Sequence, residues 1–392
     1  MTSSGNCSGS RAALAALALL CGCATSQPPR LPDAARRAQP LAFFPPSNLS
    51  GAVAPMADLA ADLEKALRAR GVQLVSGAAL EPFLAAHRVR YVAGVGPEIA
   101  TRARDELGVS GVVISTLTSY QEDPPRLGFE LRVVSATDEP QILWSEGAAR
   151  AGDESPGLFE LGIVREMKRL RQRLFEPLAE SLASWQRGRA VPQSACAPAK
   201  RFGPRIWFRA PALDGQDRWT IAVLPFVNRT SRRSAGDVVP LQFVRQLHAS
   251  GRFRVIEPGV VREELLRFRV VMEEGVSLDM ARVVMELLDA DLVLAGEVSA
   301  YGDAVSAAVA PSVQFTAMVL DREQSELLWE STSDSRGDDG VFFFDAGKVS
   351  TADALTCRMA RTVVDALVAG PAPPPPRRFE VPPPPGPFDL LP

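Results

Sequence analysis

The sequence predicts an α/β fold in which two tandem homologous domains each form a mixed sheet with flanking helices. The first observation behind this prediction is the apolar run I-A-V-L-P-F-V-N-R-T over residues 221–230, which ends at a proline and an asparagine. Such a run is typical of a buried strand that ends in a turn. The second observation is that residues 41–50 repeat this pattern as L-A-F-F-P-P-S-N-L-S. The chain therefore contains two copies of one unit.

The third observation is that one offset in numbering relates many positions of the two copies. This offset, 225 − 45 = 180, relates Pro45 with Pro225, Asn48 with Asn228, Leu63 with Phe243, Leu67 with Leu247, Gly71 with Gly251, Val75 with Val255, Glu106 with Glu286, and Ser119 with Ser299. For Trp144 and Trp329 the offset is 329 − 144 = 185, and an insertion in the loop after Tyr301 accounts for the difference, 185 − 180 = 5. A register held over this length indicates duplication; a chance similarity of two α/β patterns is the alternative.

The order of elements in the first copy follows from periodicity and punctuation. After the opening strand we expect a helix over 56–70, a strand over 72–75, a helical stretch from about 78, a helix over 97–107, a strand over 109–117, a hairpin of 129–134 with 141–145, and a helix over 158–185. Leu59, Leu63 and Leu67 recur at helical spacing, and Gly71 ends that segment. Pro97 stands at a first helical position, where its missing N–H costs nothing. The second copy repeats this order.

Changes in composition set the expected domain boundaries. They are a lipoprotein signal peptide at 1–22, a tether at 23–40, the first repeat at 41–186, a proline-rich linker at 187–218, the second repeat at 219–370 and a proline-rich tail at 371–392. The linker shows no sustained periodicity, and the tail has the composition of an extended polyproline chain without a core. We interpret the tail as a solvated spacer; a peptide that docks onto a periplasmic partner is the alternative.

The amino-terminal leader indicates export and lipidation. One arginine precedes the apolar run 12–20, which has the length of a signal-peptide core and is too short to span a bilayer. The residues that follow resemble a bacterial lipobox, with cleavage between Gly22 and Cys23 and a lipid on Cys23. Cys21 fits less well because a leucine stands directly before it. The alanine after Cys23 resembles a signal for the outer membrane, and an ordinary secretory signal cleaved nearby is the alternative.

Composition and residue content narrow the classes of function. A formal net charge of −3 gives no electrostatic footprint for nucleic acid. We predict no catalytic residue, no metal site and no cofactor, because His87 and His248 each lack a second ligand at metal spacing. His248 lies near the end of an expected helix, where we interpret its role as a favourable contact with the helix dipole.

Two cysteines remain besides those of the leader. Cys196 lies in the expected linker and Cys357 on an expected helix. An exported protein would permit a disulfide between them. Their spacing gives that pairing little support, so we expect two unpaired thiols.

Three motifs of the second copy resemble a known family. They are I-A-V-L-P-F-V-N-R-T from Ile221, L-D-A-D-L-V-L-A-G-E-V from Leu288, and V-L-D-R-E-Q-S-E-L-L-W-E-S from Val319. Together they resemble the α/β domain shared by the amino-terminal region of TolB and by CsgG and LpoB, to which PelC is related in fold. In the first copy Gly111 replaces Asp291, so that copy has drifted. The motifs consist of core strands and turns and indicate fold more than function.

The resemblance implies two classes of role for a protein anchored at the periplasmic face of the outer membrane. One is a non-enzymatic lipoprotein that binds or regulates an envelope protein partner, as LpoB-like proteins do. The alternative is a structural ring subunit of a secretion or polysaccharide-export complex, similar to CsgG or PelC, which would make the chain a homo-oligomer. An enzyme is a third class, which only an unrecognised catalytic constellation would support.

Overall fold

The computed structural model describes residues 39–154, 161–189, 200–214, 218–269, 277–303, 309–323, 326–341 and 347–369. By their contacts, all of these ranges belong to one unit, Pro32–Pro392. The expected leader with Gly22 and Cys23, the tether up to residue 38, Cys196 and the proline-rich tail lie outside the described residues. None of the described helices is long and apolar enough to cross a membrane.

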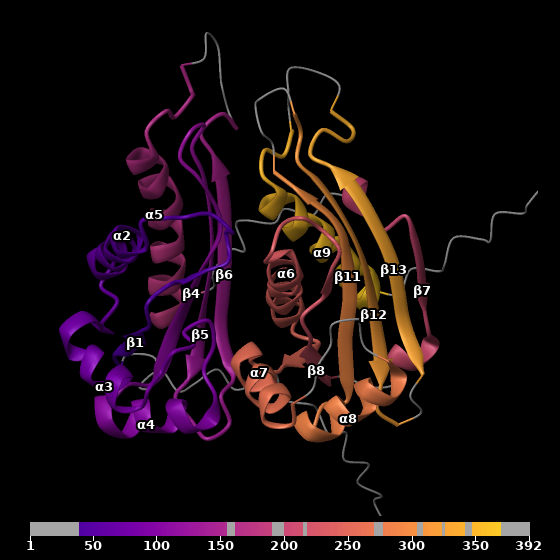
Figure 1. Ribbon diagram of the computed structural model, residues 1–392, viewed down its shortest axis with the longest axis horizontal. Helices are drawn as coiled ribbons and strands as arrows, with labels where there is room; N and C mark the ends of the chain where they lie inside the picture. Colours follow the sequence, from indigo (N-terminus) through magenta and orange to yellow (C-terminus); the bar gives the residue numbers. More distant parts are fainter. Residues whose placement is uncertain are drawn as a thin grey trace, which may run out of the picture. The chain divides into compact units, whose positions relative to one another are not determined.

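The first sheet is mixed, as the sequence predicts (Figure 1). Its strands are β1 Leu41–Phe43, β2 Ser47–Asn48, β3 Leu74–Val75, β4 Gly111–Gln121, β5 Arg126–Ser135 and β6 Ile142–Ala151. Their order is β3-β1-β4-β5-β6, and β2 also pairs with β4. β1 runs parallel to β3 and β4, whereas β4, β5 and β6 form an antiparallel meander.

Helices cover both faces of the first sheet. One face carries α2 Met56–Ala69 and α5 Met167–Gln186, and the other carries α3 Glu81–Ala86 and α4 Pro97–Leu107. Leu59, Leu63 and Leu67 of α2 are fully buried, as their spacing predicts, and they share one core with Leu174 of α5. The helix predicted over 97–107 is confirmed as α4. A stripe of apolar side chains on one side of each helix explains this arrangement.

The second sheet has the same strand order with one strand added at its edge. Its strands are β7 Ile206–Arg209, β8 Trp219–Val223, β9 Val227–Asn228, β10 Phe253–Val255, β11 Leu292–Gly302, β12 Ser312–Asp321 and β13 Leu327–Arg336. The order is β10-β8-β11-β12-β13-β7, and β9 also pairs with β11. Its helices are α6 Ala235–Ser250, α7 Pro258–Arg267, α8 Leu278–Leu288 and α9 Ala352–Ala369. α6 and α9 cover one face of this sheet. α7 and α8 cover part of the other face, at the bottom of the view in Figure 1.

Both sheets carry β-bulges at corresponding places. β4 and β5 slip register between Leu117 and Ser119, and β11 and β12 slip between Val298 and Ala300. The outer hairpins also change register at matching positions, after Val133 in the first sheet and after Val319 in the second. Bulges increase the twist of a strand locally, so the two sheets twist at corresponding positions.

The strand pairing corrects part of the predicted register. Leu41 lies opposite Leu74 in the first sheet, and Ile221 lies opposite Val255 in the second. Val255 therefore corresponds to Leu74 and not to Val75. A one-residue insertion in the turn before β10 explains the shift, because turns absorb added length at low cost.

The same one-residue shift persists beyond that turn. α4 and α8 each end at a residue in the left-handed conformation, Gly108 and Asp289, and the offset between these two is 289 − 108 = 181. The bulges of β4 and β11 give the same offset. The predicted pairs Glu106–Glu286 and Ser119–Ser299 are therefore each wrong by one position. Gly111 likewise corresponds to Leu292 and not to Asp291, because they pair with Leu41 and Ile221.

The last helix of the first repeat begins later than predicted. The sequence predicts it from 158, but α5 begins at Met167. Before it, the backbone N–H of Val164 donates to the carbonyl of Gly152 at 2.8 Å, which holds this segment against the end of β6. Leu161, within the predicted helix 158–185, is 85% exposed and lies outside α5. A hydrogen bond to the end of the preceding strand, which periodicity does not report, takes the place of a helical turn at Val164.

The segment expected as a linker contributes to the second sheet. β7, within 187–218, pairs antiparallel with β13 and forms the edge of that sheet. Trp207 of β7 stacks on Trp329 with ring centroids 5.5 Å apart. The expectation of a segment without regular structure is therefore wrong for Ile206–Arg209. Its partner strand lies far away in the sequence, which local periodicity does not reveal.

The two repeats pack sheet against helix. Figure 1 shows α6 and α9 between the two sheets, so these helices contact β6 of the first repeat as well as their own sheet. β5 is consequently buried at all ten of its positions, 126–135. Its counterpart β12 alternates between buried and partly exposed positions. The first sheet is thus covered on both faces, and the second sheet has one face that is partly open among the described residues.

Candidate functional site

The two strand-turn motifs hold identical turns. The Asn228 amide donates to the carbonyl of Arg232 at 2.7 Å, and its side-chain oxygen accepts from the Thr230 N–H at 3.0 Å and from the Thr230 hydroxyl at 2.7 Å. The side-chain oxygen of Asn48 accepts in the same way from Ser50, at 2.9 and 2.7 Å. Such bonds let the side chain replace the backbone partners that a turn leaves unpaired. The asparagines therefore have a structural role.

The prolines of the motifs, Pro45 and Pro225, each stand two residues after the end of a strand and are exposed. After Pro225, the backbone N–H of Phe226 donates to the carbonyl of Gly236 at 2.8 Å. A Cβ at Gly236 would lie 2.3 Å from the Phe226 carbonyl oxygen, so only glycine allows this approach. The contact fixes the start of α6 beside the motif of the second repeat.

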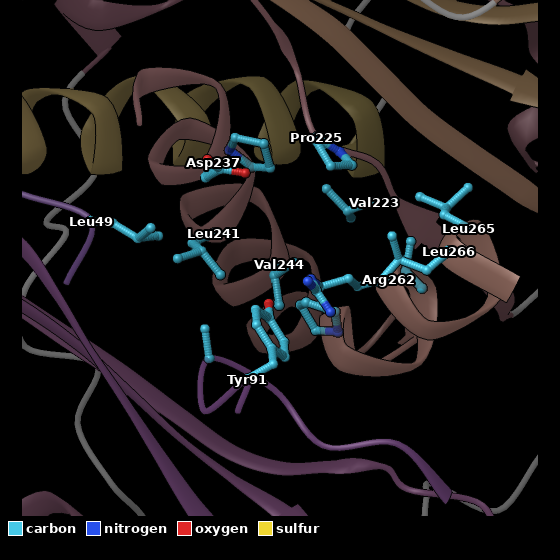
Figure 2. A pocket seen from close by; sticks show the side chains of 14 residues that line it. Leu49, Tyr91, Val223, Pro225, Asp237, Leu241, Val244, Arg262, Leu265 and Leu266 are labelled. Carbon is cyan, nitrogen blue, oxygen red and sulfur yellow. The ribbon is translucent and has the colours of Figure 1, made fainter. Parts of the chain in front are cut away.

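A cavity of about 440 Å³ lies beside Pro225 (Figure 2). Its walls come from β8, α6 and α7 of the second repeat and from two loops of the first repeat. Most of its lining is apolar and includes Leu49, Val223, Pro240, Leu241, Val244 and Val261. Leu266 stands at the mouth and is 59% exposed. A concave, mainly apolar site of this size suits a ligand group or an inserted side chain.

Three polar side chains line this cavity. The Arg262 guanidinium lies 4.0 Å from the centroid of the Tyr91 ring, and Figure 2 shows the two side by side. Partial burial raises the pKa of Tyr91, so its phenol stays protonated at neutral pH. Neighbouring atoms also partly desolvate the Asp237 carboxyl and raise its pKa. The site thus offers an apolar floor with a cation, a carboxyl and a phenol on its walls.

A buried ion pair holds the wall that carries Tyr91. Arg132 of β5 donates to both oxygens of Glu257 at 2.9 and 3.0 Å, and it also donates to the carbonyl of Ala93. Glu257 is the N-cap of α7 and is fully buried. Burial alone would lower the pKa of Arg132, but the Glu257 carboxylate raises it, so the guanidinium stays charged. The pair therefore connects the first-repeat loop of the cavity to α7 of the second repeat.

A second buried polar cluster lies between β5 and the helices α6 and α9. The carboxylate of Glu130 accepts from Gln242 at 2.9 Å and lies 3.0 Å from a guanidinium nitrogen of Arg245. Gln242 also donates to Asp353 at 2.6 Å, and Asp353 accepts from the hydroxyl of Thr118. Burial raises the pKa of Glu130 to about 8, although Arg245 opposes the rise. This cluster fills the contact between the repeats and is not part of the cavity.

The described residues show no grouping suited to metal binding. No three His, Cys, Asp or Glu side chains among them come together as metal ligands. His87 lies 2.9 Å from Glu106 in a partly exposed pair on the first repeat. Burial lowers the pKa of His248 to about 4, so its imidazole is neutral at pH 7. The expected interaction of His248 with the helix dipole is therefore wrong, because a neutral ring carries no charge to stabilise.

Cys357 does not carry a free thiol. It is buried in α9 and disulfide-bonded, and its partner lies outside the described residues. The expectation of an unpaired thiol at this position is therefore wrong. Spacing in the sequence does not report which cysteines the fold brings together.

Local sequence patterns reveal neither the cavity nor the ion pair, although two of their residues carry a signal. Glu130 and Arg132 alternate with apolar residues along a strand, which indicates a polar row on one face. Glu257 stands directly before a proline, which is typical of a helix N-cap followed by a first-turn proline. Neither signal shows that the two meet.

Comparisons with known proteins give slight structural similarities. No family model and no curated protein sequence matches the chain. It is similar to the PelC dodecamer from Paraburkholderia phytofirmans, at 18% identity and a TM-score of 0.25, over 40% of this chain and 94% of that one. It is similar to the lipoprotein GNA1162 from Neisseria meningitidis, at 19% identity and a TM-score of 0.25, over 30% of this chain and 79% of that one. It is also similar to the LpoB C-terminal domain from Escherichia coli, at 16% identity and a TM-score of 0.23, over 32% of this chain and 93% of that one. Similarities this slight carry no argument about function.

Proposed function

We propose that the chain is a non-enzymatic lipoprotein, anchored through a lipid on Cys23 at the periplasmic face of the outer membrane, that binds an envelope protein partner. The observation that carries partner binding is the apolar cavity between Tyr91 and α7. Its mouth has an exposed leucine, Leu266, and its walls combine apolar side chains with one cation and one carboxyl. We propose no catalytic residue, metal or cofactor for this function.

The chemistry of the cavity favours a protein as the ligand. An apolar side chain inserted into a pocket with a polar rim is the usual anchor of a protein interface. Arg262 and Asp237 offer opposite charges to the polar groups that flank such an anchor. The partner segment that fits is an apolar anchor with a charged or hydrogen-bonding neighbour.

Two observations support the proposed location. The leader combines a signal-peptide core with a lipobox-like cysteine. The disulfide at Cys357 suits an oxidising compartment such as the periplasm. The attachment strength would come from the acyl chains on Cys23, since stable anchoring needs more than one chain.

We further propose that the two repeats are homologous copies of a domain of the TolB amino-terminal, CsgG and LpoB type. The matching strand order and the matching bulges of the two sheets support this. The proposed layout keeps a signal peptide at 1–22 and a tether at 23–40. It assigns β7 to the second repeat and ends that repeat at about 370.

A photo-crosslinking residue placed at Leu266 tests partner binding in cells. We expect one discrete crosslinked product in the membrane fraction. Leu241→Glu in the same chain puts a charge on the apolar wall and should abolish the product. Val53→Glu, at a position that is 98% exposed and outside the cavity, should leave the product unchanged. A product that survives Leu241→Glu, or no discrete product at all, would contradict the proposal.

A structural subunit of a secretion or polysaccharide-export complex is the second candidate function. The observation that favours it is the partly open face of the second sheet, where β12 alternates between buried and partly exposed residues. An exposed sheet face is a surface that another subunit can cover.

A further inference from the structure

The contact between the repeats covers one row of side chains on the first sheet. Thr116, Glu130 and Gly147 lie directly opposite one another across β4, β5 and β6, so their side chains share one face. This face lies under α6 and α9. Thr116 is fully buried and Glu130 is 6% exposed. Arg245 of α6 reaches down to Glu130 at 3.0 Å.

Among the described residues, no helix covers the corresponding row of the second sheet, and its side chains are partly exposed. Glu297, Thr316 and Thr332 lie opposite one another across β11, β12 and β13, at the positions that match the first row. β7 extends this row with Ile206, which is 73% exposed, and the neighbouring row with Phe208, which is 48% exposed. Neighbouring apolar side chains that are exposed beside polar ones are typical of an interaction surface. We call the face defined by these five residues the open sheet face.

In the first repeat, α2 and α5 are the helices equivalent to α6 and α9, and their outer surface is exposed among the described residues. α2 and α5 cover the first sheet as α6 and α9 cover the second, but among the described residues no sheet lies on their outer side. Lys65 corresponds to Arg245 at the offset of 180 (245 − 65). Lys168 corresponds to Asp353 at 185 (353 − 168), the offset that also relates the two tryptophans of the outer hairpins. Both lysines are exposed.

The open sheet face and α5 are complementary in charge. Glu330 is exposed on that face, whereas the Glu297 carboxylate lies 3.3 Å from a guanidinium nitrogen of Arg229. The first half of α5 is basic, with Lys168, Arg169 and Arg173 exposed. Complementary charges of this kind set the register and orientation of an interface.

We infer that the open sheet face binds the α2/α5 surface of a second copy of this chain. The contact would repeat between molecules what α6 and α9 make within one. Because different surfaces meet, the contact is heterologous, and successive copies either close into a ring or continue as a filament. This inference rests on the second candidate function, in which the chain is a structural subunit of a complex. It adds the two surfaces through which neighbouring copies would bind.

The contact between copies is expected to be looser than the contact between the repeats. A Cβ at Gly147 would lie 2.1 Å from a guanidinium nitrogen of Arg245, so the internal contact leaves no room for a side chain there. The second sheet has Thr332 at the matching position. In the contact between copies, Lys65 and Thr316 stand in place of Arg245 and Glu130, so the buried polar contacts of the internal cluster are not reproduced. We therefore expect an assembly that depends on protein concentration.

Cysteine crosslinking between two full-length, lipidated variants tests this arrangement. Lys65→Cys and Thr316→Cys are purified separately in mild detergent, mixed and treated with a short bis-maleimide. These positions match Arg245 and Glu130, which meet only through the ends of long side chains, whereas a disulfide spans at most about 7 Å between Cα atoms. We expect a mixed crosslinked dimer well above the level given by the parent protein. The matched control replaces Lys65→Cys with Glu98→Cys, at an exposed position on α4. We expect that mixture to give only the parent level.

Light scattering of the parent protein completes the test. We expect its mass to rise above that of one chain as concentration increases, and Thr332→Arg to hold it at the mass of one chain. A Lys65–Thr316 product no stronger than the control, or a mass that stays at one chain throughout, would overturn the inference. Either result would leave partner binding unaffected, because the Leu266 crosslink reports on the cavity alone.

Discussion

Arg132 and Glu257 form a bidentate ion pair, at 2.9 and 3.0 Å, that joins β5 of the first repeat to the N-terminus of α7 in the second. Both side chains are almost completely buried. The same Arg132 also holds the carbonyl of Ala93, which lines the cavity. The pair therefore links the contact between the repeats to the shape of the candidate binding site.

Breaking this pair should destabilise the whole chain. Arg132→Met leaves the Glu257 carboxylate buried without its cation, which costs about 3–5 kcal/mol in comparable cases. We expect a drop of that size in the free energy of unfolding, measured by denaturant titration. The double variant Arg132→Met with Glu257→Met should recover much of the loss, because it leaves no lone buried charge.

An exposed ion pair provides the control for that series. Arg282 and Glu286 are 3.4 Å apart on α8, and their side chains are 63% and 60% exposed. Arg282→Met should change the free energy of unfolding by less than about 0.5 kcal/mol. Equal effects of Arg132→Met and Arg282→Met would contradict the role given to the buried pair.

The raised pKa of Glu130 predicts that stability falls as pH rises. Its pKa is about 8 in the folded chain, because of burial, against an ordinary value of 4.5. Between about pH 5 and pH 8 the folded chain therefore keeps a proton that the unfolded chain has lost. The free energy of unfolding should fall over this window, by at most about 1.4 kcal/mol per pH unit from this group. Denaturant titrations at several pH values measure the slope.

Glu130→Gln assigns that slope to its residue. Glutamine keeps an oxygen that can accept from Gln242 but cannot ionise, so the slope should become shallower in the variant. Asp353, whose pKa is also raised chiefly by burial, contributes in the same direction and leaves a residual slope. An identical slope in parent and variant would show that Glu130 does not titrate in this window.

Glycine at position 128 is required by the contact between the repeats. A Cβ there would lie 2.5 Å from a carboxylate oxygen of Asp353 on α9 and 2.7 Å from the Thr118 hydroxyl. Gly128→Ala should therefore destabilise the chain by about 1–3 kcal/mol, the usual cost of overpacking. Gly302→Ala is the matched control in the second sheet, since its nearest contact would be 3.4 Å away. Thermal unfolding of both variants measures the difference, and equal midpoints would contradict the close packing.

The disulfide at Cys357 is directly measurable. In a non-reducing peptide map, we expect the peptide that contains Cys357 to be recovered linked to a second cysteine-containing peptide. Cys357→Ser should lower the free energy of unfolding by about 2–4 kcal/mol. Alkylation of Cys357 in the unreduced, unfolded protein would show instead that the thiol is free.

The sequence predicts the mixed α/β architecture because its signals are local. Leu59, Leu63 and Leu67 mark α2 by their spacing, and Pro97 marks the start of α4. The errors come from contacts across the chain. Val164 is held by the end of β6 and does not join α5. Ile206–Arg209 form a strand because they pair with β13.

The candidate site could not be predicted for the same reason. Pro225 was singled out by its strand-turn motif, and it does line the cavity. Tyr91 and Arg262 come from different repeats and stand far apart in the sequence, and only the packing of one repeat on the other brings them together. The sequence shows that one side chain is a cation and the other a phenol, but the contact between them depends on the tertiary fold.

The location at the outer membrane is the claim on which both candidate functions rest, and labelling of Cys23 tests it most directly. Cells producing the parent chain, Cys21→Ser or Cys23→Ser are fed a labelled fatty acid and fractionated. We predict label in the outer-membrane fraction for the parent and for Cys21→Ser, and none for Cys23→Ser. Label that persists in Cys23→Ser, or a parent chain without label, would contradict the proposed anchor and with it the envelope function.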